Sequence, residues 1–243
     1  GSILGLAGDV DPDAVTTLVE RLVSSWSGSC PEPVAQGSPL AGKGHVQRES
    51  AQVHVAMAWE APPAGSKTAI MERLATRILG GATSGRLFTE VRQRRSLCYS
   101  VSATYRARRD VGEISLYAGT TPERASETLD VCLTEIDRMQ EGISEEEFDR
   151  AMVGLRGSTV FNGERTQARA AALVGDFYAL GRVRSMEDRL EELANVSLED
   201  VNAYLRDRAR PEPTIVTVGR EALAADFETE PPLCSPGTPS SDA

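Results

Sequence analysis

The amino-acid sequence predicts an α+β fold: a mostly antiparallel or mixed sheet with helices packed on one face. Its segments follow one another as strand, helix, strand, helices, hairpin, long helix, further helices and a closing strand. This order lacks the steady strand–helix alternation of a doubly wound parallel sheet. The helix-like segments carry apolar stripes at helical spacing, which is the pattern of helices that cover a sheet.

The first elements are a strand and a helix. Residues 3–9 (ILGLAGD) form a short apolar run that ends in glycine, which favours a buried strand. Asp11 is suited to cap a helix that has Pro12 in its first position. The apolar side of this helix comprises Val15, Leu18, Val19, Leu22, Val23 and Trp26. Residues 27–44 are rich in Gly, Pro and Ser, and predict a loop.

The central region predicts strands around two helices. A strand is expected within 46–60, and a helix over 66–79 that the glycines at 80–81 end. A shorter helix is expected over 84–95. The next strand, over 97–105, places Leu97, Tyr99, Val101, Ala103 and Tyr105 on one face. Its hairpin partner carries Ile114, Leu116 and Ala118.

Helices dominate the second half of the sequence. One starts at Thr121-Pro122, and the next has a capping box of Ser144 and Glu147. Further helix starts are expected at Ser185 and Ser197, and a closing strand at 213–219. We expect a single domain over 1–226, followed by a flexible Pro- and Ser-rich tail over 227–243.

Composition narrows the class of protein. The net charge of −10 argues against broad affinity for nucleic acid or for an anionic membrane. No apolar run approaches the roughly 20 residues of a membrane span, and no leader peptide is visible. These features predict a soluble protein of unknown compartment, with the bacterial cytoplasm and periplasm both open. The scattered cysteines Cys30, Cys98, Cys132 and Cys234 predict reduced thiols.

The residues themselves predict no catalytic zinc in this chain. Only His45 and His54 are available, nine residues apart, and neither stands in an H-x-x-E-H or H-E-x-x-H motif. Two histidines also leave no catalytic triad to propose. We therefore expect neither a catalytic residue nor a metal ligand here.

The glycine- and arginine-rich stretch at 80–99 (GGATSGRLFTEVRQRRSLCY) has features of two other kinds of site. Glycines before a helix can face an anion, but Gly80 and Gly85 are followed by Arg86 and Leu87 rather than by the Lys-Ser/Thr of a P-loop. The arginine cluster could contact a nucleic-acid strand; it comprises Arg92, Arg94, Arg95, Arg106, Arg108 and Arg109. The acidic balance favours a solvated arginine face instead.

The same stretch resembles the pitrilysin/insulinase family of zinc peptidases, the inverzincins. The matching features are the Gly-Gly turn, Ser-x-Arg-Leu-Phe, Glu-Val-Arg, a basic spacer and Leu-x-Tyr-Ser-Val before a hairpin. The resemblance is to the second, non-zinc domain of a family half-molecule, and it extends over about 3–219. One departure is Cys98, where the family usually has a smaller residue.

The resemblance implies a pair of similar α+β domains that face each other across a closed chamber. One domain carries zinc, and the other supplies an arginine and a tyrosine that bind the substrate carbonyl, here Arg92 and Tyr99. The implied cofactor is zinc held by another domain, fused in the same polypeptide or on a partner chain, so a two-half assembly is expected. The implied ligand is a peptide, and the fragment alone is expected to be inactive.

Alternatives remain open at this point. Arg92 could be a rim arginine and Tyr99 a core residue of its strand. The chain could also be a non-catalytic scaffold or assembly subunit of the same fold, or a nucleic-acid binder with steeply salt-dependent affinity.

Overall fold

The computed structural model describes residues 2–29, 42–81, 83–209, 211–224 and 227–229. The chain divides into two compact units. The first unit joins residues 1–39 with 152–195, and the second joins 40–151 with 196–243.

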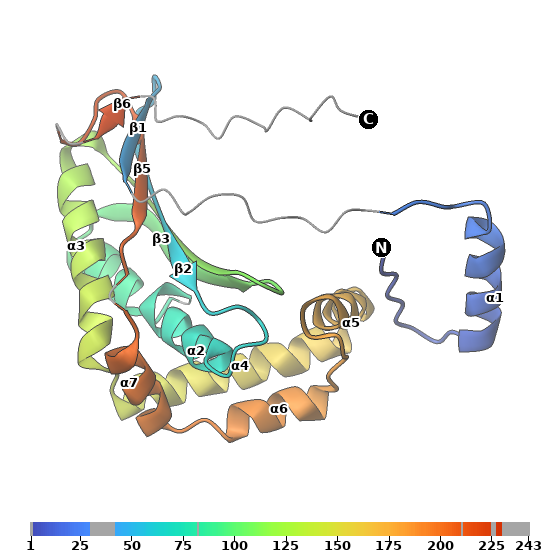
Figure 1. The fold of residues 1–243 in the computed structure, drawn as a ribbon. Coiled ribbons are helices and arrows are strands. Elements are labelled where there is room, and N and C mark those ends of the chain that lie inside the picture. Colours follow the sequence, from blue (N-terminus) through green and yellow to red (C-terminus); the bar gives the residue numbers. More distant parts are fainter. Residues whose placement is uncertain (1, 30–41, 82, 210, 225–226, 230–243) are drawn as a thin grey trace. The chain divides into compact units, whose positions relative to one another are not determined.

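The second unit is built on one sheet (Figure 1). In the described part of the chain its six strands lie in the order β3-β4-β2-β5-β1-β6. Their bounds are β1 Lys43–Gln47, β2 Val53–Ala61, β3 Cys98–Ala107, β4 Gly112–Thr120, β5 Thr214–Gly219 and β6 Glu228–Thr229. Strands β3, β4, β2 and β5 pair antiparallel, whereas β1 pairs parallel with β5 and β6. The predicted mixed sheet of an α+β fold is confirmed.

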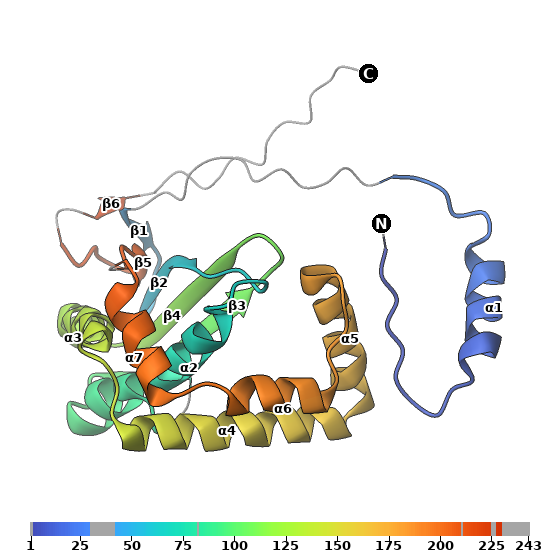
Figure 2. The ribbon, with the colours of Figure 1, turned by 60° about the horizontal axis from the view of Figure 1, so that its bottom comes forward.

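One face of this sheet is buried and the other is open. In β2 the odd-numbered residues Val53, Val55, Met57 and Trp59 are buried, whereas Ala56, Ala58 and Glu60 are exposed. Two helices of this unit, α2 (Ala69–Gly80) and α3 (Ala125–Arg138), pack on the buried side of the sheet, and α7 (Leu198–Asp207) packs against α2. Figure 2 shows α2 and α7 side by side next to the sheet, as their contacts require.

A glycine lets α2 end close to the sheet. A Cβ added at Gly80 would lie 2.9 Å from the backbone nitrogen of Ala103 in β3 and 2.7 Å from Leu87. Only a residue without a side chain fits between the helix and the strand. The predicted Gly80-Gly81 stop is confirmed, with Gly81 as the C-cap.

The predicted capping box at Ser144 and Glu147 is part of a larger clamp. The Glu147 carboxylate accepts a hydrogen bond from the Ser144 backbone N–H at 2.9 Å, and Arg86 donates to it at 2.7 and 2.9 Å. Arg86 also donates to the backbone oxygens of Arg138 and Gly142. Burial alone raises the pKa of Glu147, but the Arg86 guanidinium and the Ser144 N–H outweigh it and lower the pKa from 4.5 to about 2. This clamp fixes the start of α4 (Glu145–Glu164).

Acid should weaken this clamp in a defined window. Because the folded pKa of Glu147 lies below its unfolded value, its stabilisation is complete above pH 4.5 and is lost as the pH falls to about 2. We expect Glu147→Gln to lower the free energy of unfolding by about 2 kcal/mol at neutral pH, with the difference from wild type vanishing near pH 2. Urea unfolding at a series of pH values measures this. Glu146→Gln is the control because Glu146 is exposed, and a pH-independent difference for Glu147→Gln would contradict the assignment.

The first unit contains α1 (Pro12–Val23), α5 (Thr166–Leu180), α6 (Met186–Ala194) and most of α4. The predicted caps are confirmed: Asp11 accepts from the Asp13 N–H at 3.0 Å, and Ser185 forms a capping box with Asp188. In the second unit Ser197 caps α7 in the same way. Within the described residues no helix combines the length and the apolar character that a membrane crossing requires.

The structure corrects the prediction for residues 3–9. They form no strand, and Ile3, Leu4 and Leu6 are exposed. The apolar side of α1 is also uncovered, because none of its residues is buried. A strand needs a neighbour for its backbone hydrogen bonds, and no described strand pairs with this segment.

The predicted tail over 227–243 lies mostly outside the described residues. Phe227 is buried and residues 228–229 form β6, while 230–243 are not described. The single-domain boundary at 226 therefore stays a prediction.

Candidate functional site

The backbone departs from regular geometry three times between residues 88 and 100. Phe88–Arg94 forms η1, a π-helix. Ser96 has a φ of 53°, in the left-handed region that residues with a side chain seldom adopt. Strand β3 then begins with a β-bulge between Cys98 and Ser100. π-Helices, left-handed residues and bulges are each enriched at functional sites, so this segment is the first candidate.

The bulge decides where Tyr99 lies. Cys98 pairs with Thr120 and Ser100 pairs with Gly119, which leaves Tyr99 as the extra residue of β3. Its side chain is 60% exposed. With regular alternation, Tyr99 would lie on the same face as Leu97 and Val101. The bulge turns its side chain outward instead. The interpretation of Tyr99 as a core residue is therefore wrong.

Arg92 is exposed on η1 and lies over the ring of Phe88, with its guanidinium carbon 5.1 Å from the ring centroid. In the part of the chain that the structure describes, its guanidinium makes no hydrogen bond or ion pair. Burial raises the pKa of the Cys98 thiol and the positive charge of Arg92 opposes this rise. Arg92 is therefore near enough to the start of β3 for its charge to act there.

The neighbouring arginines are engaged, in contrast to Arg92. Arg94 and Arg95 each contact the Glu90 carboxylate at 2.6 Å. Burial raises the pKa of Glu90, but the hydrogen bond from Arg95 and the charge of Arg94 lower it overall. Glu90 is thus an ionised anchor for two arginines of η1, and Arg92 is left free to contact a ligand.

Hydrogen bonds hold the end of η1 against the start of β3. The Leu97 N–H donates to the Val91 carbonyl at 2.9 Å, and the Ser96 N–H donates to the Arg92 carbonyl at 3.1 Å. Arg124 donates to the Ser96 carbonyl, and Thr120 to the Leu97 carbonyl. The segment that carries Arg92 is therefore fixed to the segment that carries Tyr99. The hydrogen bonds from Arg124 and Thr120 were not predicted from the sequence. Both donors are more than 20 residues away from the carbonyls that accept from them, and no sequence pattern indicates such a contact.

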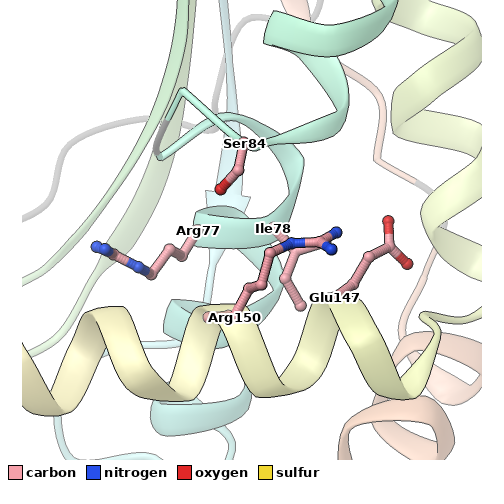
Figure 3. A pocket seen from close by; sticks show the side chains of 6 residues that line it. Arg77, Ile78, Ser84, Glu147 and Arg150 are labelled. Atoms are coloured by element: carbon pink, nitrogen blue, oxygen red, sulfur yellow. The ribbon is translucent and has the colours of Figure 1, made fainter.

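The anion-site alternative concerns the stretch at 80–86, of which residues 80–81 and 83–86 are described. Next to it is a hollow with room for little more than one water molecule, about 20 Å³. It is lined by Arg77, Ile78, Ser84, Glu147, Arg150 and Ala151. Figure 3 shows the guanidinium groups of Arg77 and Arg150 pointing in opposite directions, and Arg86 is already bound to Glu147.

Comparison with known proteins identifies the family. The family described as the peptidase M16 inactive domain matches residues 3–155. The chain belongs to this family. The family predicted from the stretch at 80–99 and from the resemblance over about 3–219 is thereby confirmed.

Relatives of this inactive domain are named zinc proteases. A protein of Streptomyces coelicolor, named an uncharacterized zinc protease, is 32% identical over 89% of the chain and 50% of its own length. A protein of Mycobacterium tuberculosis with the same description is 32% identical over 84% of the chain and 48% of its own length. The chain spans about half the length of the curated relatives it matches.

Solved structures share the fold of this M16 inactive domain. The peptidase M16 inactive domain from Pseudomonas fluorescens has a TM-score of 0.76 at 21% identity, over 92% of this chain and 54% of that one. A chain of complex III2 from Candida albicans has a TM-score of 0.75 at 18% identity, over 88% and 54%. At these identities the likeness concerns the fold alone.

The described residues of this M16 inactive domain do not fit a zinc site. No three or more His, Cys, Asp or Glu side chains gather among them to hold a metal. His45 is buried on β1 with its Nδ1 2.9 Å from the Thr217 hydroxyl. The Nδ1 of His54 is 2.7 Å from the Tyr117 hydroxyl on the other face of the sheet.

The described cysteines, Cys98 and Cys132, are free and buried. Burial raises the pKa of Cys132 to about 12, so its thiol is protonated and unreactive at neutral pH. Cys30 and Cys234 lie outside the described residues.

Proposed function

We propose that this chain is the substrate-binding half of a zinc-dependent metalloendopeptidase. Arg92 and Tyr99 would contribute hydrogen-bond donors to a substrate carbonyl, and the zinc would be held by another domain or subunit. One observation carries this proposal: two donor side chains stand exposed on one irregular segment, while Arg94 and Arg95 beside them are bound to Glu90.

The proposed role follows from the chemistry of the two side chains. A peptide carbonyl under attack develops negative charge on its oxygen, and fixed donors aimed at that oxygen lower the barrier. A guanidinium remains charged at all relevant pH values and a phenol hydroxyl donates one hydrogen bond, so both can stabilise an oxyanion without accepting its proton. The hydrogen bonds between η1 and β3 would keep these donors in place before substrate arrives.

The missing chemistry would come from the other half. Zinc on that domain would supply a Lewis acid and an activated water. The relatives support a missing half, since they are named zinc proteases and this chain covers about half of each. The partner would be a zinc-bearing peptidase domain, fused to this chain or separate from it, and the substrate a peptide.

The alternative is a non-catalytic scaffold of the same fold. It is favoured by one observation, the similar fold of a chain of complex III2 from Candida albicans. A scaffold has no need for two unengaged donors on an irregular segment, which is why we prefer the peptidase half. Nucleic-acid binding by the arginine cluster is disfavoured because several of its arginines already have carboxylate partners. Arg94 and Arg95 are bound to Glu90, and Arg106 lies 3.7 Å from Glu113.

The proposal is tested by comparing the chain alone with the complete protein. The purified 243-residue chain should bind no stoichiometric zinc and should not cleave a library of internally quenched peptides. A polypeptide or complex that adds the H-x-x-E-H domain should cleave some of them, and a chelator should abolish this. Zinc-dependent cleavage by the isolated chain would overturn the proposal, and a complete protein that binds zinc but cleaves no peptide would favour the scaffold.

A further inference from the structure

A polar row crosses three strands on the open face of the sheet, next to Tyr99. Gly119 of β4 pairs with His54 of β2 on one side and with Ser100 of β3 on the other. Residues paired in this way point to the same face. Ser100 directly follows Tyr99 in the chain, so the row begins one residue from the proposed carbonyl-binding tyrosine.

Tyr117 leans across this row toward His54. Its hydroxyl oxygen lies 2.7 Å from the His54 Nδ1. The two rings are stacked, with their centroids 5.9 Å apart and 28° between their planes. Tyr117 nevertheless remains 39% exposed and His54 is only half-buried. Both side chains are therefore accessible to a ligand from the open face of the sheet.

Gly119 has no side chain, and we call the space above its backbone, between the Tyr117 and Ser100 hydroxyls, the recess. A Cβ added there would lie 3.0 Å from the Tyr117 hydroxyl and 3.2 Å from the Ser100 hydroxyl. Both oxygens therefore flank the space above the Gly119 backbone. A side chain in that position would push the Tyr117 hydroxyl away from His54 or fill the recess.

The His54–Tyr117 pair offers a complementary set of polar groups in either tautomer. If Tyr117 donates to Nδ1, the imidazole keeps an N–H at Nε2 and the phenol oxygen can accept. If Nδ1 carries the proton and donates to Tyr117, the phenol O–H can donate and Nε2 can accept. One donor and one acceptor side by side match an amide, which has one C=O and one N–H.

We propose that His54 and Tyr117, with the Ser100 hydroxyl, bind a backbone amide of the peptide substrate within about three residues of the carbonyl held by Arg92 and Tyr99. This inference rests on the proposed function. Neighbouring strands lie about 4.8 Å apart and an extended peptide advances about 3.3 Å per residue, so a peptide that runs across the strands from Tyr99 passes over Ser100, Gly119 and His54 within about three residues. His54 and Tyr117 are then binding residues that hold the substrate in register, and they take no part in proton transfer.

Steady-state kinetics of the complete enzyme test this inference. Tyr117→Phe and Gly119→Ala should each raise KM by about fivefold and leave kcat nearly unchanged, because a lost ground-state hydrogen bond has about that effect on affinity. His54→Gln, which keeps an amide near the position of Nε2, should retain more affinity than His54→Ala. Thr104→Ala is the matched control, since Thr104 pairs with Ser115 on the same face, farther along β3.

The possible outcomes separate this inference from the proposed function. If Arg92→Ala lowers kcat while Tyr117→Phe and Gly119→Ala leave KM unchanged, the recess is not a subsite and the proposed function stands. If Arg92→Ala changes nothing either, both fail. Equal effects of Tyr117→Phe and Thr104→Ala would also overturn the inference.

A second measurement uses the 243-residue chain without zinc. The sequence contains two histidines, and His45 is buried, so the ring C–H resonances of His54 are readily assigned by NMR. Titration with millimolar acetyl-hexaalanine amide should shift the His54 resonances saturably and leave those of His45 in place. In Tyr117→Phe the apparent Kd should rise about fivefold. Absence of any His54 response would overturn the inference.

Discussion

Replacing Tyr99 with phenylalanine should lower the kcat of the complete enzyme by about a hundredfold or more, with the zinc content unchanged. The change removes a single hydroxyl from a side chain that is 60% exposed, so the fold should be unaffected. Loss of one preorganised oxyanion donor typically has this effect on turnover. Arg92→Ala should act in the same way, because the Arg92 guanidinium has no ion pair among the described residues that its removal would break.

The control for this experiment lies on the same segment. Arg94→Ala removes an arginine two residues from Arg92, but one that is bound to Glu90 and 68% exposed. It should change kcat by less than about twofold, since exposed ion pairs contribute little. Steady-state rates with one cleavable peptide, together with zinc analysis of each variant, decide the outcome. Turnover that is unchanged in both Tyr99→Phe and Arg92→Ala would remove these residues from the site.

The loss of turnover should also be distinguishable from a loss of affinity. If Arg92 and Tyr99 act on the oxyanion, their removal lowers kcat and kcat/KM together, whereas removal of the His54–Tyr117 contacts raises KM alone. Tyr99 of the first pair directly precedes Ser100 in β3, and Ser100 begins the row that crosses the sheet to His54. Their kinetic signatures would therefore map which part of the peptide each pair contacts.

The hairpin was predicted well from the sequence because the alternation of apolar and polar residues along a strand depends only on neighbouring residues. Ile114, Leu116 and Ala118 alternate with polar or small residues, and all three are buried against the helices. The orientation of Tyr99 could not be predicted in the same way. A single extra residue in β3 reverses the alternation, and the bulge between Cys98 and Ser100 has no glycine or proline to mark it.

The N-terminal segment shows a different limit. The helix α1 was correctly predicted, yet Leu22 on its apolar side is 70% exposed. Trp26, which was assigned to the same side, lies beyond the end of the helix at Val23 and is 72% exposed. Periodicity shows that a segment has an apolar face, but it does not show what the face packs against. The predicted strand at 3–9 failed for the same reason, since the partner strand is a property of the whole fold.

Long-range polar contacts were the least predictable part. Glu72 lies in the first turn of α2, where an acidic residue is ordinarily solvated. It is instead only 3% exposed. Its carboxylate accepts two hydrogen bonds from Arg208, both at 2.9 Å, and one from the Tyr204 hydroxyl. Burial and the nearby Glu72 charge raise the pKa of Tyr204 well above its usual range, so the phenol remains a donor.

Breaking this buried pair should cost more stability than any other single change considered for the chain. In Arg208→Met the methionine fills part of the space but leaves the Glu72 carboxylate buried with Tyr204 as its remaining strong donor. We expect the free energy of unfolding to fall by about 3–5 kcal/mol, because a buried charge loses its counter-charge. Urea unfolding at neutral pH measures this loss.

The double variant Glu72→Gln/Arg208→Met separates the charge from the packing. Glutamine has nearly the same shape as glutamate and keeps an acceptor for the Tyr204 hydroxyl, but it needs no counter-charge. If the loss in Arg208→Met comes from the uncompensated carboxylate, the double variant should recover most of it, since neutral replacements of a buried ion pair are often well tolerated. If the loss comes from the packing of Arg208 over the Tyr204 ring, 6.0 Å from its centroid, the double variant should be as unstable as Arg208→Met. Equal stability of Arg208→Met and wild type would mean that the ion pair between Glu72 and Arg208 contributes nothing to the stability of the fold.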